Sequence, residues 1–251
     1  MIFLRSTIFN IWFYGSTFVC TLAACLGSLI SAPLASAVAR GWAKANVTAL
    51  RIVCGIKIEV VGWELIPGGP VIIASQHQSA LDTFIWFALL KNGVYVLKQE
   101  LIQIPILGWL LLRLGNIAVD RAAGASALRG LLKEGSATLQ SGRIVVIFPE
   151  GTRVAAGERG TLHPGVAALA SYTGAPVLPV ATDSGYCWGR NAFTKRPGIV
   201  HVVIRPALPI GLKRPELIAA LQRSWDDGQR GIARAVDNSV GQIDQTAGSI
   251  E

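Results

Sequence analysis

The sequence predicts an α/β fold: a layered domain with a central mixed, largely parallel sheet flanked by helices, plus an N-terminal apolar membrane helix or helical pair. Short runs rich in β-branched residues alternate with helical patterns along most of the chain, which is typical of layered α/β domains. Several of these runs end in polar or charged residues, as expected at the edge of a sheet where ligands bind. By contrast, residues 6–39 contain no Asp, Glu, Lys, Arg or His.

The uncharged N-terminal stretch is long enough to enter a lipid bilayer. The segment IFNIWFYGSTFVCTLAACLGSLI (8–30) exceeds the roughly 20 apolar residues that a membrane-spanning helix needs. A full span is one interpretation, and a helical pair that enters and leaves the same leaflet, broken near GSLISAP (27–33), is another. A secretory signal peptide with LASA (34–37) as its cleavage site is a third. So long an uncharged run argues against a buried core helix of a soluble protein.

Basic residues follow the apolar stretch and outnumber acidic residues in the whole chain. The positive-inside rule applied to Arg40, Lys44 and Arg51 places the remainder on the cytoplasmic side of the cell (inner) membrane. The 23 Lys and Arg against 15 Asp and Glu give a net charge of +8, with a mean hydropathy of +0.47. A basic, apolar chain without dense Lys/Arg runs indicates an anionic membrane surface as partner, and no nucleic acid.

The remaining elements follow in order after the leader. Seven β-rich runs are expected to form the sheet, at 56–62, 70–75, 93–98, 115–119, 143–149, 175–181 and 199–206. Helices are expected at 38–53, 82–91, 103–113, 123–141, 163–173 and 214–236. We therefore divide the chain into a membrane-anchoring segment (1–55), an α/β domain (56–240) and a polar tail (241–251).

Two kinds of site are not indicated. Cys20, Cys25, Cys54 and Cys187 form no C-x-x-C pair, so neither a disulfide scaffold, a zinc site nor another metal site is expected. A lipid hydrolase should carry a nucleophile elbow of the form G-x-S-x-G, and the sequence has none.

His77 and Asp82 stand on the turn between a predicted strand and the next helix. A carboxylate near the start of a helix suits the positive end of the helix dipole. A turn between the two residues can bring Asp82 to one imidazole nitrogen and leave the other nitrogen as an acceptor. A general base needs this arrangement, although H-x-x-x-x-D alone is also compatible with an ordinary surface histidine.

A second polar turn follows the predicted strand in IVVIFPEGTR (144–153). Its glycine, Gly151, permits unusual backbone angles, and Arg153 offers a fork suited to phosphate or carboxylate. Lys98 and Asp120–Arg121 end two further strands. Several cationic groups beside a histidine suggest an anionic substrate whose hydroxyl is deprotonated.

HQSALD (77–82) followed by FPEGTR (148–153) resembles the glycerolipid acyltransferase superfamily, and within it the 1-acylglycerol-3-phosphate (lysophosphatidic acid) acyltransferases. The resemblance extends over about 58–210 and includes APVLPVATDSG (175–185). Each motif alone is weak, but the pair in this order and spacing is highly specific.

The resemblance implies roles for individual residues. His77 would be the base that activates the glycerol hydroxyl, and Asp82 would orient and stabilise its imidazole. Lys98, Arg121 and Arg153 would bind the phosphate of the acceptor.

Other positions of the motifs would shape the loops. Glu150, Gly151 and Thr152 belong to the turn of the second motif, and Pro179 belongs to the segment APVLPVATDSG (175–185), which contains the fourth motif of the family. Gln76 departs from the family pattern, because many relatives have asparagine there. His163 departs as well, because lysine is common at its position.

The resemblance also implies the reaction. An acyl chain would pass from acyl-CoA or acyl carrier protein to the sn-2 hydroxyl of 1-acyl-sn-glycerol 3-phosphate, giving phosphatidic acid for phospholipid biosynthesis. The thioester would be a co-substrate, and no cofactor is expected. The alternatives are another lysolipid acceptor and, in a different class, an exported lipid-binding module without catalytic activity.

The apolar run LIQIPILGWLLLRL (101–114) has two functional interpretations beyond core packing. Its aliphatic residues suit a groove for an acyl chain, and they equally suit a surface that dips into lipid.

Overall fold

Seven strands form one mixed sheet, and the strand order determines where the candidate site lies. The computed structural model describes residues 1–247. The strands are β1 (Ile56–Val61), β2 (Ile72–Ser75), β3 (Gly93–Lys98), β4 (Ile117–Val119), β5 (Ile144–Ile147), β6 (Val177–Thr182) and β7 (Gly198–Ile204). Their order across the sheet is β1-β7-β6-β2-β5-β3-β4. β6 and β7 pair antiparallel, whereas the other neighbouring strands pair parallel. The predicted mixed, largely parallel sheet is confirmed.

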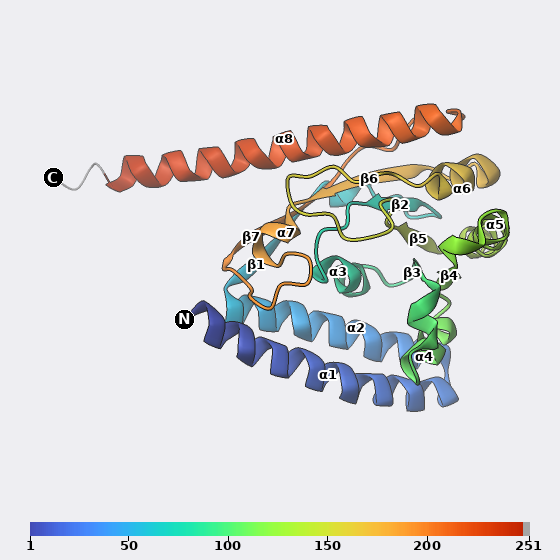
Figure 1. Ribbon diagram of the computed structural model, residues 1–251, viewed down its shortest axis with the longest axis horizontal. Coiled ribbons are helices and arrows are strands. Elements are labelled where there is room, and N and C mark those ends of the chain that lie inside the picture. Colours follow the sequence, from blue (N-terminus) through green and yellow to red (C-terminus); the bar gives the residue numbers. More distant parts are fainter. Residues whose placement is uncertain (248–251) are drawn as a thin grey trace.

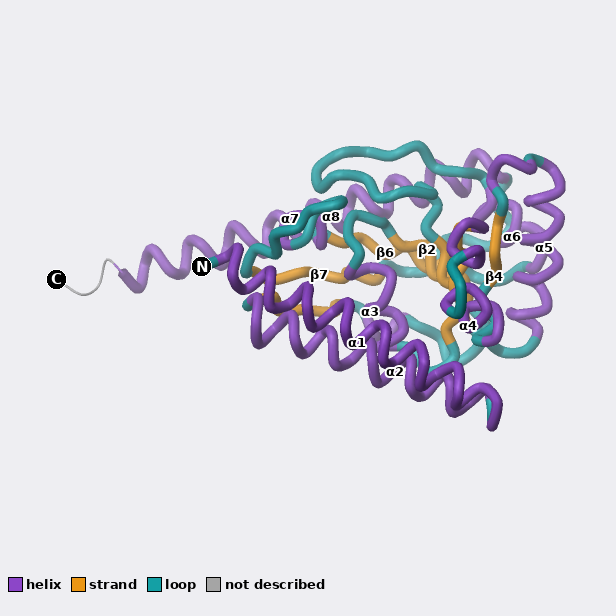
Figure 2. The backbone as a smooth tube through the Cα atoms, turned by 60° about the horizontal axis from the view of Figure 1, so that its bottom comes forward, coloured by secondary structure: helices purple, strands orange, loops and turns teal. Residues whose placement is uncertain are grey.

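Helices cover both faces of this sheet (Figures 1 and 2). One face carries α1 (Ile2–Ile30), α2 (Ala32–Ala49) and α3 (Leu81–Leu89), and the other carries α5 (Ala125–Gln140), α6 (Gly165–Thr173) and α8 (Arg214–Ala247). The shorter helices are α4 (Leu107–Arg113) and α7 (Ser184–Cys187). α8 continues to Ala247, beyond the end expected near 236, and residues 248–251 of the expected polar tail lie outside the described residues.

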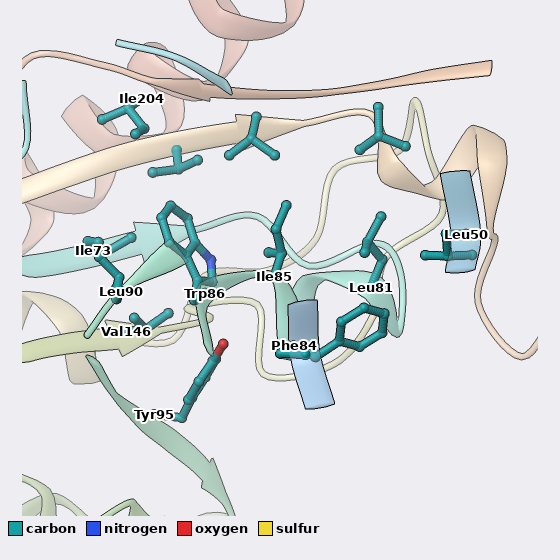
Figure 3. Packing of buried hydrophobic residues seen from close by; sticks show 14 of the residues in the cluster. Leu50, Ile73, Leu81, Phe84, Ile85, Trp86, Leu90, Tyr95, Val146 and Ile204 are labelled. Carbon is teal, nitrogen blue, oxygen red and sulfur yellow. The ribbon is translucent and has the colours of Figure 1, made fainter. Parts of the chain in front are cut away.

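Alternate residues of the central strands pack into two separate cores. Ile73 of β2 and Val146 of β5 lie in one core with Trp86 of α3 (Figure 3). Ile72 and Val145 point to the opposite face, against α5, α6 and α8. Strands that are buried on both faces read as continuous apolar runs, which is why their sequence pattern was strong.

The uncharged leader folds as two helices that are separated at Ser31. The Ser31 side chain accepts the backbone N–H of Leu34 at 3.3 Å, and Pro33 occupies the first turn of α2. Proline is favoured there because its missing N–H needs no partner. The break falls within 27–33, where the helical-pair interpretation placed it. α1 is long and apolar enough to cross a membrane by length and composition.

This helical hairpin shares a core with the α/β domain. Phe9 of α1 is fully buried and lies in one cluster with Ala43 of α2 and Val200 of β7. The helix expected at 38–53 is the second half of α2 followed by a π-helical turn, Leu50–Cys54. Residues 1–55 therefore pack on the α/β domain instead of standing apart from it.

Candidate active site

Parallel strands bring the two sequence motifs to one edge of the sheet. β2 pairs with β5 in parallel, with Ala74 beside Ile147, so HQSALD and FPEGTR leave the sheet at the same edge. β3 and β4 continue the parallel pairing, and Lys98 and Arg121 follow at that edge. The sequence-based expectation that these strand ends converge agrees with this topology.

His77 and Asp82 form a hydrogen-bonded pair at the end of β2. Nδ1 of His77 lies 3.3 Å from Oδ2 of Asp82. The same oxygen accepts the backbone N–H groups of Gln78 at 2.7 Å and Ser79 at 2.8 Å. Because Oδ2 accepts two backbone N–H groups, it is an acceptor, and the proton of the imidazole is assigned to the nitrogen that faces it. Nε2 is then the acceptor, and it bonds to no residue that the structure describes.

The segment that follows β5 holds His77 from the other side. The backbone N–H of His77 donates to Oε2 of Glu150 at 2.6 Å, and the His77 carbonyl accepts the N–H of Val154 at 2.8 Å. The imidazole stacks on the ring of Phe148, with ring centres 4.3 Å apart. The second motif thus fixes both the backbone and the ring of the histidine.

Glu150 is a buried acid directly behind His77. Its side chain is almost fully buried, and this burial raises the pKa of Glu150 to about 8. The N–H of His77 lowers the pKa in part, and the charge of Asp82 raises it further. Near neutral pH a large share of Glu150 is therefore protonated, which leaves Asp82 as the acid whose charge faces the imidazole.

Gly151 lies where a side chain would not fit. Its φ is +69°, and a Cβ atom there would stand 2.9 Å from both Nη1 of Arg121 and Cδ2 of His163. Arg121 donates a hydrogen bond to the Gly151 carbonyl. Burial lowers the pKa of the Arg121 guanidinium, and the charge of Glu100 opposes this shift. The glycine therefore allows an arginine to close against the turn.

The predicted phosphate ligands differ in what they already bind. Lys98 forms an ion pair with Glu100 at 2.5 Å, and both side chains are more than half exposed. Arg121 contacts the turn, as described above. The half-buried Arg153 side chain makes no hydrogen bond or ion pair with the described residues, while its neighbour Thr152 is exposed. Arg153 is thus the cation most available to an incoming anion.

Pro179 lies inside the sheet rather than at its edge. It is buried in β6 beside Ala74 of β2, and its carbonyl accepts the N–H of Arg205 at 2.9 Å. The structure therefore places Pro179 under the site, where it supports the strand that leads into His77.

Sequence reasoning missed two features of this region. Phe148 was part of the second motif, but nothing in the sequence indicated that its ring stacks on His77. A second pair joins Nδ1 of His201 to Oδ2 of Asp183 at 2.7 Å, and both side chains are buried. The position of Asp183, two residues after the predicted strand 175–181, was the available signal.

The arrangement combines a histidine that could act as a base, a turn with an unpaired arginine and, among the described side chains, no cluster of metal ligands. Among the side chains that the structure describes, no group of three or more His, Cys, Asp or Glu residues could hold a metal ion. A histidine with a fixed tautomer and a free Nε2 can take a proton from a hydroxyl. An uncommitted arginine a short distance along the second motif can bind an anionic group of the same molecule.

Comparison with known protein sequences gives a consistent result. A family model described as Acyltransferase matches residues 57–183. A Pseudomonas aeruginosa protein named 1-acyl-sn-glycerol-3-phosphate acyltransferase is 40% identical over 186 residues, which cover 74% of this chain and 72% of that protein. A Chlamydomonas reinhardtii protein of the same name is 30% identical over 173 residues, and this chain covers 52% of its length.

A solved structure shares the fold. The crystal structure of the 1-acyl-sn-glycerophosphate (LPA) acyltransferase PlsC from Thermotoga maritima matches with a TM-score of 0.76 and 22% sequence identity. The match covers 93% of this chain and 98% of that chain.

Proposed function

This chain belongs to the acyltransferase family, and we propose that it transfers an acyl chain from an acyl thioester to the sn-2 hydroxyl of 1-acyl-sn-glycerol 3-phosphate, giving phosphatidic acid in phospholipid biosynthesis. The observation that supports this most directly is the His77–Asp82 pair, held at the end of β2 by the Glu150 turn. The names of the relatives support the choice of acceptor.

The proposed chemistry is a direct transfer with His77 as general base. Nε2 of His77 takes the proton of the sn-2 hydroxyl while the hydroxyl oxygen attacks the thioester carbonyl. Asp82 stabilises the imidazolium that forms. A C–O bond forms, the C–S bond breaks, and the proton passes from the imidazole to the departing sulfur. The step needs no cofactor beyond the thioester co-substrate.

Phosphate recognition is the proposed role of the cations at the same edge. Arg153 has no partner among the described residues and is free to bind phosphate oxygens in a bidentate manner. Arg121 lies against the Gly151 carbonyl and contributes charge at short range. Lys98 is paired with Glu100, so it has to exchange that partner for phosphate.

The segment 101–114 has two sides, and each suits one of the two roles suggested by its sequence: a groove for an acyl chain and a surface that dips into lipid. Leu107, Leu110, Leu111 and Leu114 line an apolar groove of about 80 Å³ between α4 and the helical hairpin. Trp109 and its neighbours Leu101, Ile104, Ile106 and Leu112 are exposed instead. We propose that the groove side receives an acyl chain and that the exposed side contacts lipid.

The helical hairpin is the proposed membrane anchor. Its outer face is an unusual apolar surface of exposed side chains, among them Ile2, Phe3, Leu4, Ile8, Ile11, Trp12, Tyr14, Phe18, Val19, Leu22, Leu26, Leu29 and Ile30. The inner side of α1 packs on the α/β domain through Phe9. We therefore propose that the hairpin enters one leaflet of the inner membrane from the cytoplasmic side.

An activity panel tests the proposed function. The purified full-length protein is assayed with lysophosphatidate, other lysophospholipids and glycerol 3-phosphate, each with acyl-CoA and with acyl carrier protein as donor. We expect the highest kcat/KM with lysophosphatidate. Transfer to another lysolipid would correct the acceptor, and binding of lipid without any transfer would favour the non-catalytic alternative.

A further inference from the structure

One face of α8 packs directly beneath the start of the His77 loop. The indole N–H of Trp225 donates to the carbonyl of Ala74 at 3.1 Å, and the indole is buried. At Gly228 a Cβ atom would stand 2.6 Å from Cβ of Ala181, so α8 approaches β6 as closely as a glycine allows. Residues 225, 228 and 229 share this face because helical neighbours recur at three and four positions.

Gln229 uses this close approach to reach the residue before His77. Its Nε2 donates to Oε1 of Gln76 at 2.7 Å and to the carbonyl of Thr182 at 2.7 Å. Oε1 of Gln76 also accepts the N–H of Thr182 at 3.1 Å. A backbone N–H only donates, so the atom of Gln76 that faces Thr182 is the oxygen, and Gln229 must present its nitrogen. Each of these three contacts thus pairs a donor with an acceptor.

The cluster restrains the peptide that enters His77. The backbone N–H of Gln76 donates to the carbonyl of Val180 at 2.9 Å. Gln76 is buried, with 8% of the residue exposed. Gln76 is thus fixed by its backbone to β6 and by its amide to both β6 and α8. A rotation of this residue would tilt the imidazole that follows it.

We propose that Gln229 is a positioning residue for the general base, acting through Gln76. The proposal rests on the proposed function of His77 in acyl transfer. An imidazole that moves by a fraction of an ångström loses its alignment with the hydroxyl proton, and a misplacement of about 1 Å can cost on the order of 100-fold in rate. Gln229 touches no reacting atom, so its effect should fall on kcat.

A polar cleft beside Gln229 makes the positioning role separable from packing. The cleft has a volume of about 240 Å³ and is lined by Gln76, Glu150, Gln222 and Gln229 among others. In Gln229→Ala, water can enter from this cleft and donate to the freed oxygens. In Gln229→Leu, the side chain keeps its volume, excludes water and removes the Gln229 donor from both oxygens, so that Oε1 of Gln76 keeps only the Thr182 N–H. A packing role predicts that Ala is worse, and a hydrogen-bonding role predicts that Leu is worse.

Steady-state kinetics of the full-length enzyme test the proposal. We expect Gln229→Leu to lower kcat by on the order of 10- to 100-fold with little change in acceptor KM, and Gln229→Ala to lose clearly less. Gln222→Leu is the matched control, because Gln222 lines the same cleft but its amide bonds to Asp226. In the double variant with Gln76→Leu, the losses should not add, since both act through one contact. Unchanged kcat in Gln229→Leu, or a greater loss in Gln229→Ala, overturns the positioning role.

A measurement without substrate separates this proposal from the proposed function. The chain has three histidines, so the ¹³Cε1 signal of His77 is identified by its disappearance in His77→Ala. We expect Gln229→Leu to move the His77 signal, and Gln222→Leu to leave it unchanged. An unmoved His77 signal refutes positioning whatever the activity, whereas a wild-type enzyme that transfers no acyl chain refutes only the proposed function.

Discussion

Oε2 of Glu150 lies 2.6 Å from the backbone nitrogen of His77, so the two motifs of the candidate site are joined by one hydrogen bond. The acid that makes this bond is buried, and its pKa is raised to about 8. From the sequence, Glu150 was expected only to shape the turn of the second motif. In the structure, its carboxyl group contacts the backbone of His77, the proposed base. Its protonation also links the stability of this region to pH.

We expect Glu150→Gln to make stability less dependent on pH. Between the ordinary value of 4.5 and the folded pKa of about 8, folded Glu150 holds a proton that the unfolded chain has released. The free energy of unfolding of the wild type therefore falls as pH rises through this window. Glutamine keeps an oxygen for the His77 N–H but cannot ionise, so the fall should become shallower.

Urea denaturation between pH 5 and pH 8.5 measures this effect. Glu158→Gln is the matched control, because Glu158 lies on the same loop but is exposed. The control should keep the wild-type slope of unfolding free energy against pH. An identical slope in Glu150→Gln would show that Glu150 does not take up a proton on folding.

His77→Ala should remove acyl transfer while leaving the fold intact. Loss of a general base costs roughly 10²- to 10⁴-fold in rate. Asp82→Asn should also be severe, because the amide cannot stabilise the imidazolium and can select the wrong tautomer. Assays at saturating substrate, with circular dichroism to confirm folding, check both variants. Turnover close to wild type in His77→Ala would exclude it as the base.

Arg153→Gln should mainly raise the KM for a phosphate-bearing acceptor. The side chain has no partner in the described structure, so its removal should cost little stability and act on ligand binding. A hydrogen bond to a charged group contributes about 1.5–3 kcal/mol, equivalent to a rise of roughly 10- to 100-fold. The KM for the thioester should change much less.

Arg121→Gln is expected to behave differently from Arg153→Gln. It also removes the hydrogen bond to the Gly151 carbonyl, so kcat and the unfolding midpoint should fall together with acceptor affinity. A lysolipid without a terminal phosphomonoester provides the reference acceptor for both variants. If each variant weakens both acceptors equally, neither arginine reads the phosphate.

The sheet was predictable because its strands are buried on both faces. The strand pattern is easily told from that of an amphipathic helix, because every residue is apolar in Ile72 to Ala74 and in Ile144 to Ile147. Turn residues stand on both sides of each run. The extension of α8 to Ala247 was missed because residues 237–247 show little apolar pattern. α7 was missed because four residues carry too little periodicity to detect.

The part of the site that could be predicted consists of residues that follow strands of the sheet. His77, Asp82 and Glu150 all follow parallel strands, and that topology brings them together without further information. Gln229 lies on the last helix, 153 positions after Gln76, and its place depends on how α8 crosses β6. No local pattern encodes such a contact, because the close approach at Gly228 is a property of packing.

The outer face of α1 provides the last prediction. Deleting the hairpin would expose the core around Phe9, so exposed positions are a better test of membrane binding. Ile11 and Phe18 are 71% and 65% exposed and lie two turns apart on α1. Each apolar side chain that enters lipid contributes about 1.5–3 kcal/mol. Ile11→Lys with Phe18→Lys should therefore weaken binding to anionic vesicles at least about tenfold, despite the added positive charge.

Charge and fold are controlled by a second pair of substitutions. Tyr172→Lys with Ile210→Lys adds the same charge at positions that are 64% and 75% exposed but lie outside the hairpin. Vesicle co-sedimentation should separate the two pairs, with the control binding at least as well as wild type because anionic lipid attracts lysine. Both double variants should still acylate a short-chain, water-soluble acceptor, since neither pair of substitutions lies at the edge of the sheet that carries His77. If the Ile11/Phe18 pair co-sediments like wild type, the outer face of α1 does not bind the membrane, and the anchor must lie elsewhere.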